Sequence, residues 1–180
     1  DDDNEQTRSV NVFDQPLKVL LIAGGPMRDY IFAKNALHRH HSIQVDIWLQ
    51  TGKPGISQDA NDILYNFPDS REDLFTYDVI VAFDPDWSEI PAENQELLEE
   101  WVASEGGGLV LIAGDVNTAE LASAISQSSN GSEHLANLYP VLLEEVRGLR
   151  SADRAEEPFP VEFTQEGAAA AFLRLQDDLS

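Results

Sequence analysis

The chain has 180 residues, 42% of them hydrophobic, and its 11 Lys and Arg against 33 Asp and Glu give a formal net charge of −22. This size and apolar content fit one α/β domain with an ordinary core, while the acidic balance excludes a basic nucleic-acid-binding surface and argues against docking on anionic lipid. The absence of cysteine excludes disulfides, thiolate metal sites and cysteine nucleophiles, and no run of about 18 apolar residues is present to span a membrane.

The N-terminal segment, residues 1–16, differs from the rest of the chain. It opens with an acidic tip, Asp1 to Glu5, without an initiating Met or a signal peptide, which indicates a fragment of a longer protein. Residues 8–13 alternate as in the last strand of a preceding domain. We therefore expect an arm or linker over residues 1–16 and a single α/β domain over residues 17–180.

Four short apolar runs predict β-strands. Residues 18–23, 78–83 and 108–113 are rich in β-branched residues and leucine without strict alternation, which is typical of parallel strands buried on both faces. Residues 43–49 alternate more regularly and predict a half-exposed or edge strand.

Helical patterns separate these strands. They cover residues 27–40, a short amphipathic piece around Ile63 to Phe67, a helix opened by Pro91 and stopped by Gly106, and residues 118–125. The β-α alternation predicts a doubly wound, three-layer α/β/α domain with a flavodoxin-like strand order, 2-1-3-4, open to extension by a later strand. Towards the C-terminus we expect a polar connection over 147–157, a strand at 160–163 and a helix at 166–175.

Ligands of such sheets bind at the carboxyl ends of the strands. The candidate ligand-binding residues at that edge are Gly24, Gly25, Arg28, Asp84, Asp86, Trp87, Gly114 and Asp115. Gly24 and Gly25 before a helix, with Arg28 nearby, are compatible with an anion-binding turn, although tight turns need glycine too.

The acidic pair after the third long strand has two interpretations. Asp84-Pro85-Asp86 resembles the DxDx[TV] loop of haloacid dehalogenase-type phosphatases, but that loop normally follows the first strand and lacks the Trp87-Ser88 found here. A divalent-cation site formed by Asp84, Asp86 and Asp115 is a related alternative. The competing interpretation is a helix-capping turn with Trp87 packed over the sheet edge.

The histidines give weak signals. His38 and His41 have the spacing of a metal-binding pair, but cations at a helix C-terminus also complement its dipole. His134 has no G-x-S-x-G partner, so a serine triad is not expected. Residues 130–132 fit a glycosylation sequon or a plain loop.

Four segments together resemble the class I glutamine amidotransferase-like superfamily. They are residues 17–32, 45–50, 77–87 and 97–115, and the resemblance extends over about residues 17–146. More narrowly, the chain resembles the putative glutamine amidotransferase domains of large bacterial membrane-anchored proteins that also carry von Willebrand A-type and Ig-like modules. The resemblance implies that residues 1–16 end an Ig-like domain.

The resemblance also shows what the chain lacks. Active members place a Cys on the elbow after a strand, and here Ala113 occupies that position. They carry a later His-x-Glu dyad, whereas His134 is followed by Leu135 and Ala136. Without the thiol no thioester can form, so the family resemblance predicts a fold rather than this activity.

The sequence thus favours a non-catalytic recognition or structural module, without a cofactor, within a larger, envelope-anchored protein. Its expected partners are other domains of the parent chain or a separate protein, not nucleic acid, and an extracytoplasmic location is favoured. The alternative is a hydrolase, or a metal- or small-ligand-binding domain, that uses Asp84, Asp86 and Asp115. Self-association into a homodimer is a third interpretation, because flavodoxin-like sheets often dimerise.

Overall fold

A computed structural model describes residues 15–54, 59–126, 133–141, 143 and 165. The chain separates into two compact units, Asp1–Glu145 and Val146–Ser180, and every element described below belongs to the first. The arm before Gln15, the sequon at 130–132, the connection at 147–157, the strand at 160–163 and the helix at 166–175 lie outside the described residues. These, and the extent of the domain to residue 180, stay predictions.

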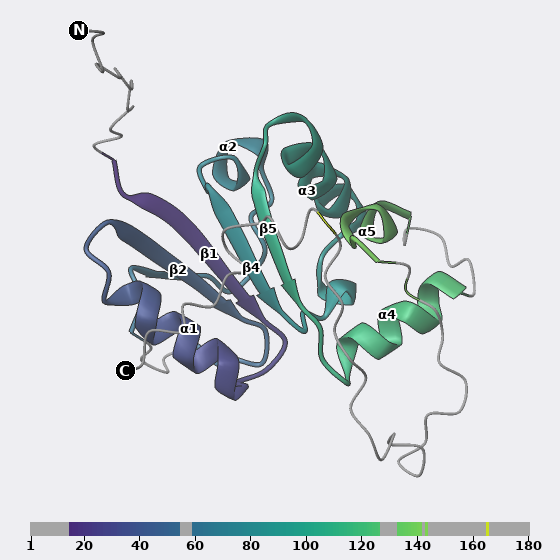
Figure 1. The fold of residues 1–180 in the computed structure, drawn as a ribbon, viewed down its shortest axis with the longest axis horizontal. Coiled ribbons are helices and arrows are strands. Elements are labelled where there is room, and N and C mark those ends of the chain that lie inside the picture. The colour runs from purple at the N-terminus through teal and green to yellow at the C-terminus, as the bar shows by residue number, and fades with distance from the viewer. Residues whose placement is uncertain (1–14, 55–58, 127–132, 142, 144–164, 166–180) are drawn as a thin grey trace, which may run out of the picture. The chain divides into compact units, whose positions relative to one another are not determined.

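Five parallel strands form one sheet in the order β3-β2-β1-β4-β5 (Figure 1). Their bounds are β1 (Leu17–Ala23), β2 (Ile43–Leu49), β3 (Asp62–Ile63), β4 (Val79–Phe83) and β5 (Gly108–Ile112). The four predicted strands are present and lie in the predicted order. The prediction that residues 43–49 form an edge or half-exposed strand is wrong, because β3 pairs with β2 and residues 45–48 are buried.

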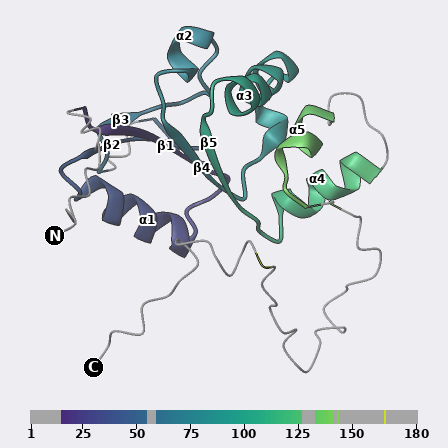
Figure 2. The ribbon, with the colours of Figure 1, turned by 45° about the horizontal axis from the view of Figure 1, so that its top comes forward.

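Helices cover both faces of the sheet, which confirms a general α/β fold (Figure 2). Their bounds are α1 (Arg28–His38), α2 (Arg71–Leu74), the 3-10 turn η1 (Trp87–Glu89), α3 (Ala92–Ser104), α4 (Asn117–Ser126) and α5 (Glu133–Leu138). Helix α1 lies on one face, and α2 and α3 lie on the other (Figures 1 and 2). Within the described ranges, no helix is long and apolar enough to cross a bilayer.

The sheet divides the core into two clusters. On the α1 side, Val19, Leu21 and Ala23 of β1 pack with Tyr30 of α1. On the opposite side, the intervening residues Leu20 and Ile22 pack against side chains from η1, α3, α4 and α5. Successive residues of a strand point to opposite faces, so the unbroken apolar run of β1 supplies both clusters at once.

Helix α3 follows the predicted pattern, with Leu98 and Trp101 buried against the sheet. It ends at the predicted glycine. Gly106 adopts φ +74°, a conformation that costs glycine little, and the Gly107 N–H donates to the Trp101 carbonyl at 3.1 Å. The helix also buries two amides that the apolar pattern did not predict, Asn94 and Gln95.

Candidate functional site

The loops that follow β1, β4 and β5 meet at the carboxyl edge of the sheet. The Gly24 N–H donates to the Phe83 carbonyl at 3.1 Å, and the Asp84 N–H donates to the Ile112 carbonyl at 2.8 Å. The sequence predicted this convergence, because the three strands are neighbours and run in the same direction. Asp84 lies at its centre and is 3% exposed.

The carboxylate of Asp84 binds the N-terminus of helix α4. Its Oδ1 accepts hydrogen bonds from the backbone N–H and the Oγ1 of Thr118, both at 2.7 Å. Its Oδ2 accepts from the backbone N–H groups of Asn117 at 3.2 Å and Val116 at 3.4 Å. The first N–H groups of a helix have no partner within the helix, so Asp84 acts as a cap supplied by another loop.

Two further features distinguish Asp84. Burial alone would raise the pKa of its carboxyl, but the hydrogen bonds from Thr118, Asn117 and Val116 outweigh burial and lower that pKa. Its backbone has φ +40°, unusual for a residue with a side chain. The Asn117 side-chain amide donates to the Asp84 carbonyl at 2.6 Å and holds this conformation from the other side.

Two candidate glycines are needed here for space. A Cβ on Gly24 would overlap the Asp84 carbonyl oxygen and the Asn117 amide, and a Cβ on Gly114 would overlap the Asp84 carboxylate. A Cβ on Gly25 would meet nothing within 4 Å. Gly24 and Gly114 therefore let the loops approach closely, a requirement that is independent of any ligand.

The positions of Asp86 and Trp87 agree with the interpretation of this loop as a helix-capping turn. Asp86 Oδ1 accepts from the backbone N–H of Ser88 at 2.9 Å and from its Oγ at 2.6 Å, which caps η1. Trp87 is 4% exposed, and its Nε1 donates to the Tyr139 hydroxyl at 3.0 Å. The Gln50 side chain, which the sequence analysis did not single out, bonds both the N–H and the carbonyl of Asp86.

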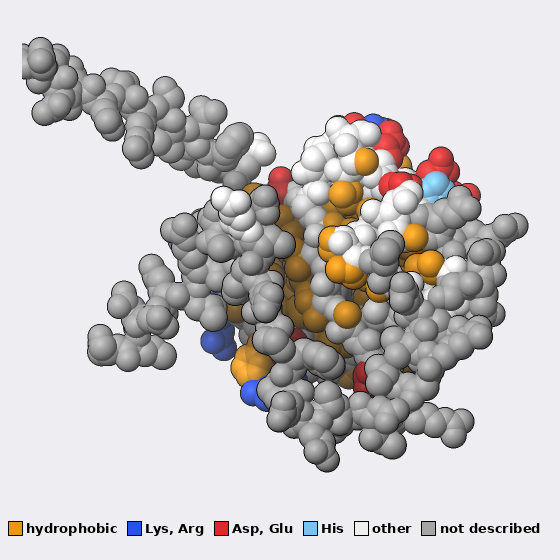
Figure 3. All heavy atoms as spheres, turned by 45° about the vertical axis from the view of Figure 1, so that its right-hand side comes forward, with side chains coloured by type: hydrophobic (Ala, Val, Ile, Leu, Met, Phe, Trp, Pro, Cys, Tyr) orange, Lys and Arg blue, Asp and Glu red, His pale blue; other side chains and the backbone are white. Residues whose placement is uncertain are grey.

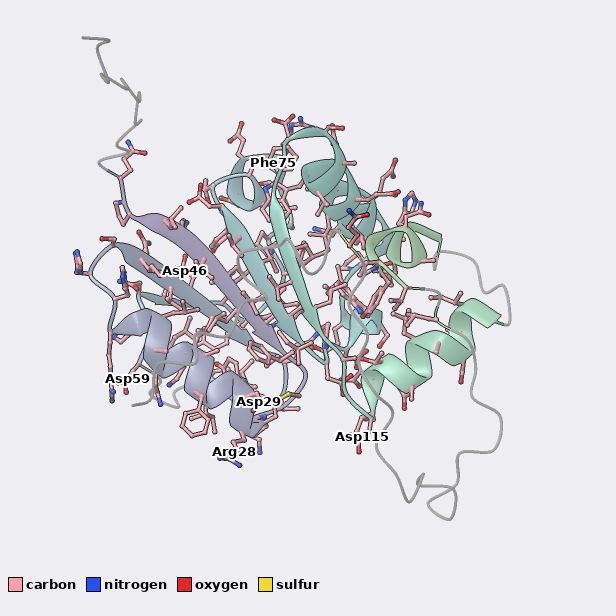
Figure 4. All side chains as sticks on the ribbon, viewed as in Figure 1. Arg28, Asp29, Asp46, Asp59, Phe75 and Asp115 are labelled. Atoms are coloured by element: carbon pink, nitrogen blue, oxygen red, sulfur yellow. The ribbon has the colours of Figure 1, made fainter. Side chains whose placement is uncertain are left out.

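The other candidates point away from this centre. Arg28 and Asp115 are exposed and project outward in Figure 4, and the Arg28 guanidinium lies 5.4 Å from the centroid of the Phe32 ring. Anion binding by Gly24, Gly25 and Arg28 thus stays a prediction. In the part of the chain that the structure describes, no three His, Asp or Glu side chains are placed to hold a metal ion.

The histidines have structural partners. His38 is the basic residue in the last turn of α1, as the dipole interpretation predicted, and the rings of His40 and His41 stack at 5.1 Å. His134 Nδ1 lies 2.5 Å from Glu99 Oε2, so it joins α5 to α3.

The residue directly after β5 has no nucleophilic side chain. Ala113 lies directly after the last residue of β5 and is exposed. Beside it, Gly114 donates its N–H to Thr118 Oγ1 at 3.1 Å. In the described loops of this edge, hydrogen bonds within the protein occupy the Asp84 carboxylate that a phosphatase-like mechanism would need.

The comparisons with known proteins add no assignment. No family model matches the chain, and neither the search of curated proteins nor the search of solved structures finds a match.

A second polar group lies away from this edge and was not predicted as a site. Asp46, in the middle of β2, is 2% exposed. Its Oδ2 accepts from the Tyr77 hydroxyl at 3.0 Å and lies 3.5 Å from Lys18 Nζ. One signal was available: Asp46 is the single charged residue in the otherwise apolar end of the run IQVDIWL.

Proposed function

We propose that this domain is a non-catalytic, flavodoxin-like module of the class I glutamine amidotransferase-like type, used for recognition or as a structural part of a larger, envelope-anchored bacterial protein. The observation that carries the proposal is that the carboxyl edge of the sheet offers no free nucleophile at the two expected positions. Ala113 stands where the nucleophile would be, and the Asp84 carboxylate accepts four hydrogen bonds from the start of α4.

The chemistry of amidotransferases supports this view. Glutamine hydrolysis in that superfamily needs a thiolate nucleophile and a histidine that moves its proton. The chain contains no cysteine, and its only histidine after the elbow, His134, pairs with Glu99 on α3. Reassigning Asp84 as a nucleophile would require breaking the cap of α4, at the cost of its unpaired N–H groups.

The surface supports a role in binding other chains. Val110, Val116 and Val141 are 49%, 57% and 62% exposed, and hydrophobic side chains reach the surface on the side that Figure 3 brings forward. Exposed apolar side chains can contribute to a protein interface, and we infer that these do. The partner we propose is another domain of the parent chain or a separate protein, with a second copy of this chain as the alternative.

Glutaminase assays test the catalytic half of the proposal. Ammonia release from glutamine is measured for the purified chain and for Ala113→Cys, which restores a thiol at the exposed elbow without disturbing the core. We expect no turnover from either protein, because no His-x-Glu dyad follows. Turnover that co-purifies with the wild-type chain and is lost in the elbow variant Asp115→Asn would overturn the proposal.

A further inference from the structure

A cavity of about 510 Å³ lies at the amino ends of β1 and β4, away from the edge that holds Asp84. Residues with different roles form it. Asp46, Phe67 and Tyr77 are buried at its wall, whereas Asp62 and Tyr65 are exposed at its rim. The cavity is open to solvent, and its volume lies within the range of small-molecule sites and exceeds what a bare metal ion needs.

Asp46 lines this cavity and carries one buried carboxylate oxygen without a hydrogen-bond partner in the described part of the chain. Its neighbours Val45 and Ile47 belong to the core on the α1 side, so Asp46 points to the opposite face, as Trp48 does. Its Oδ2 has partners, but its Oδ1 is buried and has no hydrogen-bond partner among the described residues. An unsatisfied buried carboxylate oxygen costs free energy, so a donor that reaches it would be favoured.

The contacts of Lys18 show that the wall of this cavity binds an ammonium group. The Lys18 ammonium lies 3.5 Å from Asp46 Oδ2, 3.1 Å from Thr76 Oγ1 and 4.4 Å from the centroid of the Tyr77 ring. A carboxylate, a hydroxyl and an aromatic face together form a cradle for an alkylammonium group. Burial and the Asp46 carboxylate raise the pKa of Tyr77, so its hydroxyl stays a donor to Asp46.

The charge around the cavity exceeds what Lys18 neutralises. The aspartates in its lining are Asp46, Asp62, Asp69 and Asp73, and Lys18 is the one basic residue among the lining residues. Apolar surface lies beside these carboxylates, from Ile63, Leu64, Phe67 and Pro68. The excess negative charge favours a second cation, and the apolar surface favours one that carries a hydrocarbon stem.

We propose that this cavity binds a primary alkylammonium ligand, with its ammonium donating to Asp46 and its stem lying against the Phe67 side of the wall. This inference names a ligand class for the recognition role proposed above. It does not depend on the absence of glutaminase chemistry, because the cavity and Ala113 lie at opposite ends of the sheet.

Titration of the full chain with pentylamine tests the proposal. Amide shifts are followed by NMR at constant ionic strength, with pentanol as a ligand of the same chain length without charge. We expect saturable shifts at Asp62, Tyr65 and Tyr77, with a dissociation constant of about a millimolar for so small a ligand. Pentanol and sodium chloride should produce no saturable shifts at these residues.

Variants separate the site from general screening by an acidic protein. Asp46→Asn should weaken binding by at least about tenfold, whereas Asp115→Asn removes the same charge from an exposed distant position and should leave it unchanged. If Asp46→Asn does not fold, the exposed rim variants Asp62→Asn and Tyr65→Ala replace it, each with an expected loss of affinity. Equal binding by the variants and the wild type, or the absence of saturable shifts, would overturn the proposal. A buried water would then be the expected hydrogen-bond partner of Asp46 Oδ1.

Discussion

Asp84 caps a helix that begins on another strand's loop: both the backbone N–H and the hydroxyl of Thr118, 34 residues further on, donate to the same Asp84 oxygen at 2.7 Å. This pair joins the end of β4 to the start of α4. Asp84 resembles a catalytic aspartate in the sequence, but in the structure its carboxylate is occupied by hydrogen bonds that stabilise the fold.

Replacing Asp84 should destabilise the domain. Asp84→Ala leaves the N–H groups of Val116, Asn117 and Thr118 without their acceptor, and we expect a loss of about 2 kcal/mol in the free energy of unfolding. Urea denaturation measures this loss. Asp115→Ala, which removes an exposed carboxylate beside the same loop, should change stability by less than about 0.5 kcal/mol. Equal effects of the two substitutions would contradict the cap.

The same contact predicts a specific acid sensitivity. Because the folded-state pKa of Asp84 is lowered by its hydrogen bonds, the carboxylate stabilises the fold fully above the unfolded pKa of about 4. That contribution is lost as the pH falls through the lowered pKa. We expect the difference in stability between wild type and Asp84→Asn to be constant at neutral pH and to shrink below about pH 4. Denaturation series at several pH values measure this difference. The other acidic residues are present in both proteins, so their titration largely cancels in the difference.

Gly24 and Gly25 at the carboxyl edge form a matched pair for substitution, because only one of them has room for a Cβ. Gly24→Ala places a methyl group against the Asp84 carbonyl and the Asn117 amide, and should cost about 1–3 kcal/mol of unfolding free energy. Gly25→Ala meets no neighbour within 4 Å, so it should be neutral or stabilise by up to about 1 kcal/mol through the unfolded state. Thermal unfolding of the two variants distinguishes these outcomes, and a tolerated Gly24→Ala would show that the loops are not closely packed.

Docking of α5 should depend on Glu99. Hydrogen bonds from His134 and then Asn137 lower the pKa of Glu99, so its contribution is present above the usual glutamate pKa and is lost as the pH falls through the lowered value. Glu99→Gln should speed hydrogen exchange in α5 at neutral pH while changing global stability by less than about 1 kcal/mol. The exposed neighbour Glu96 provides the control, because Glu96→Gln should leave exchange in α5 unchanged.

The local elements follow from the sequence because their signals lie within a few residues. The unbroken apolar run of β1 is typical of a parallel strand buried on both faces, and the Leu98 and Trp101 face of α3 matches the helical period. The stop at Gly106 was also predictable, since a left-handed residue after a helix is most often glycine.

The exceptions arose where a partner distant in the sequence decides the environment. The helical piece predicted around Ile63 to Phe67 is wrong, because Asp62 and Ile63 form strand β3 instead. This two-residue strand covers β2 and overturns its edge assignment. Asn94 and Gln95 look like exposed polar residues of α3, but the loops beside them bury both side chains: Asn94 donates to the Pro68 carbonyl and Gln95 donates to the Trp87 and Ile90 carbonyls.

The sequence predicts the four long strands and their order in the sheet, the absence of a thiol and the edge where Asp84 lies. What each carboxylate does at that edge follows from tertiary contacts. Asp84 is hydrogen-bonded to the N-terminus of α4, and Asp115 is exposed to solvent. Asp46, which lies inside an apolar strand, contacts Lys18 and Tyr77 at a cavity. The reason is physical: a strand's period fixes which face a side chain takes, but its hydrogen-bond partners come from segments that only the folded sheet makes neighbours.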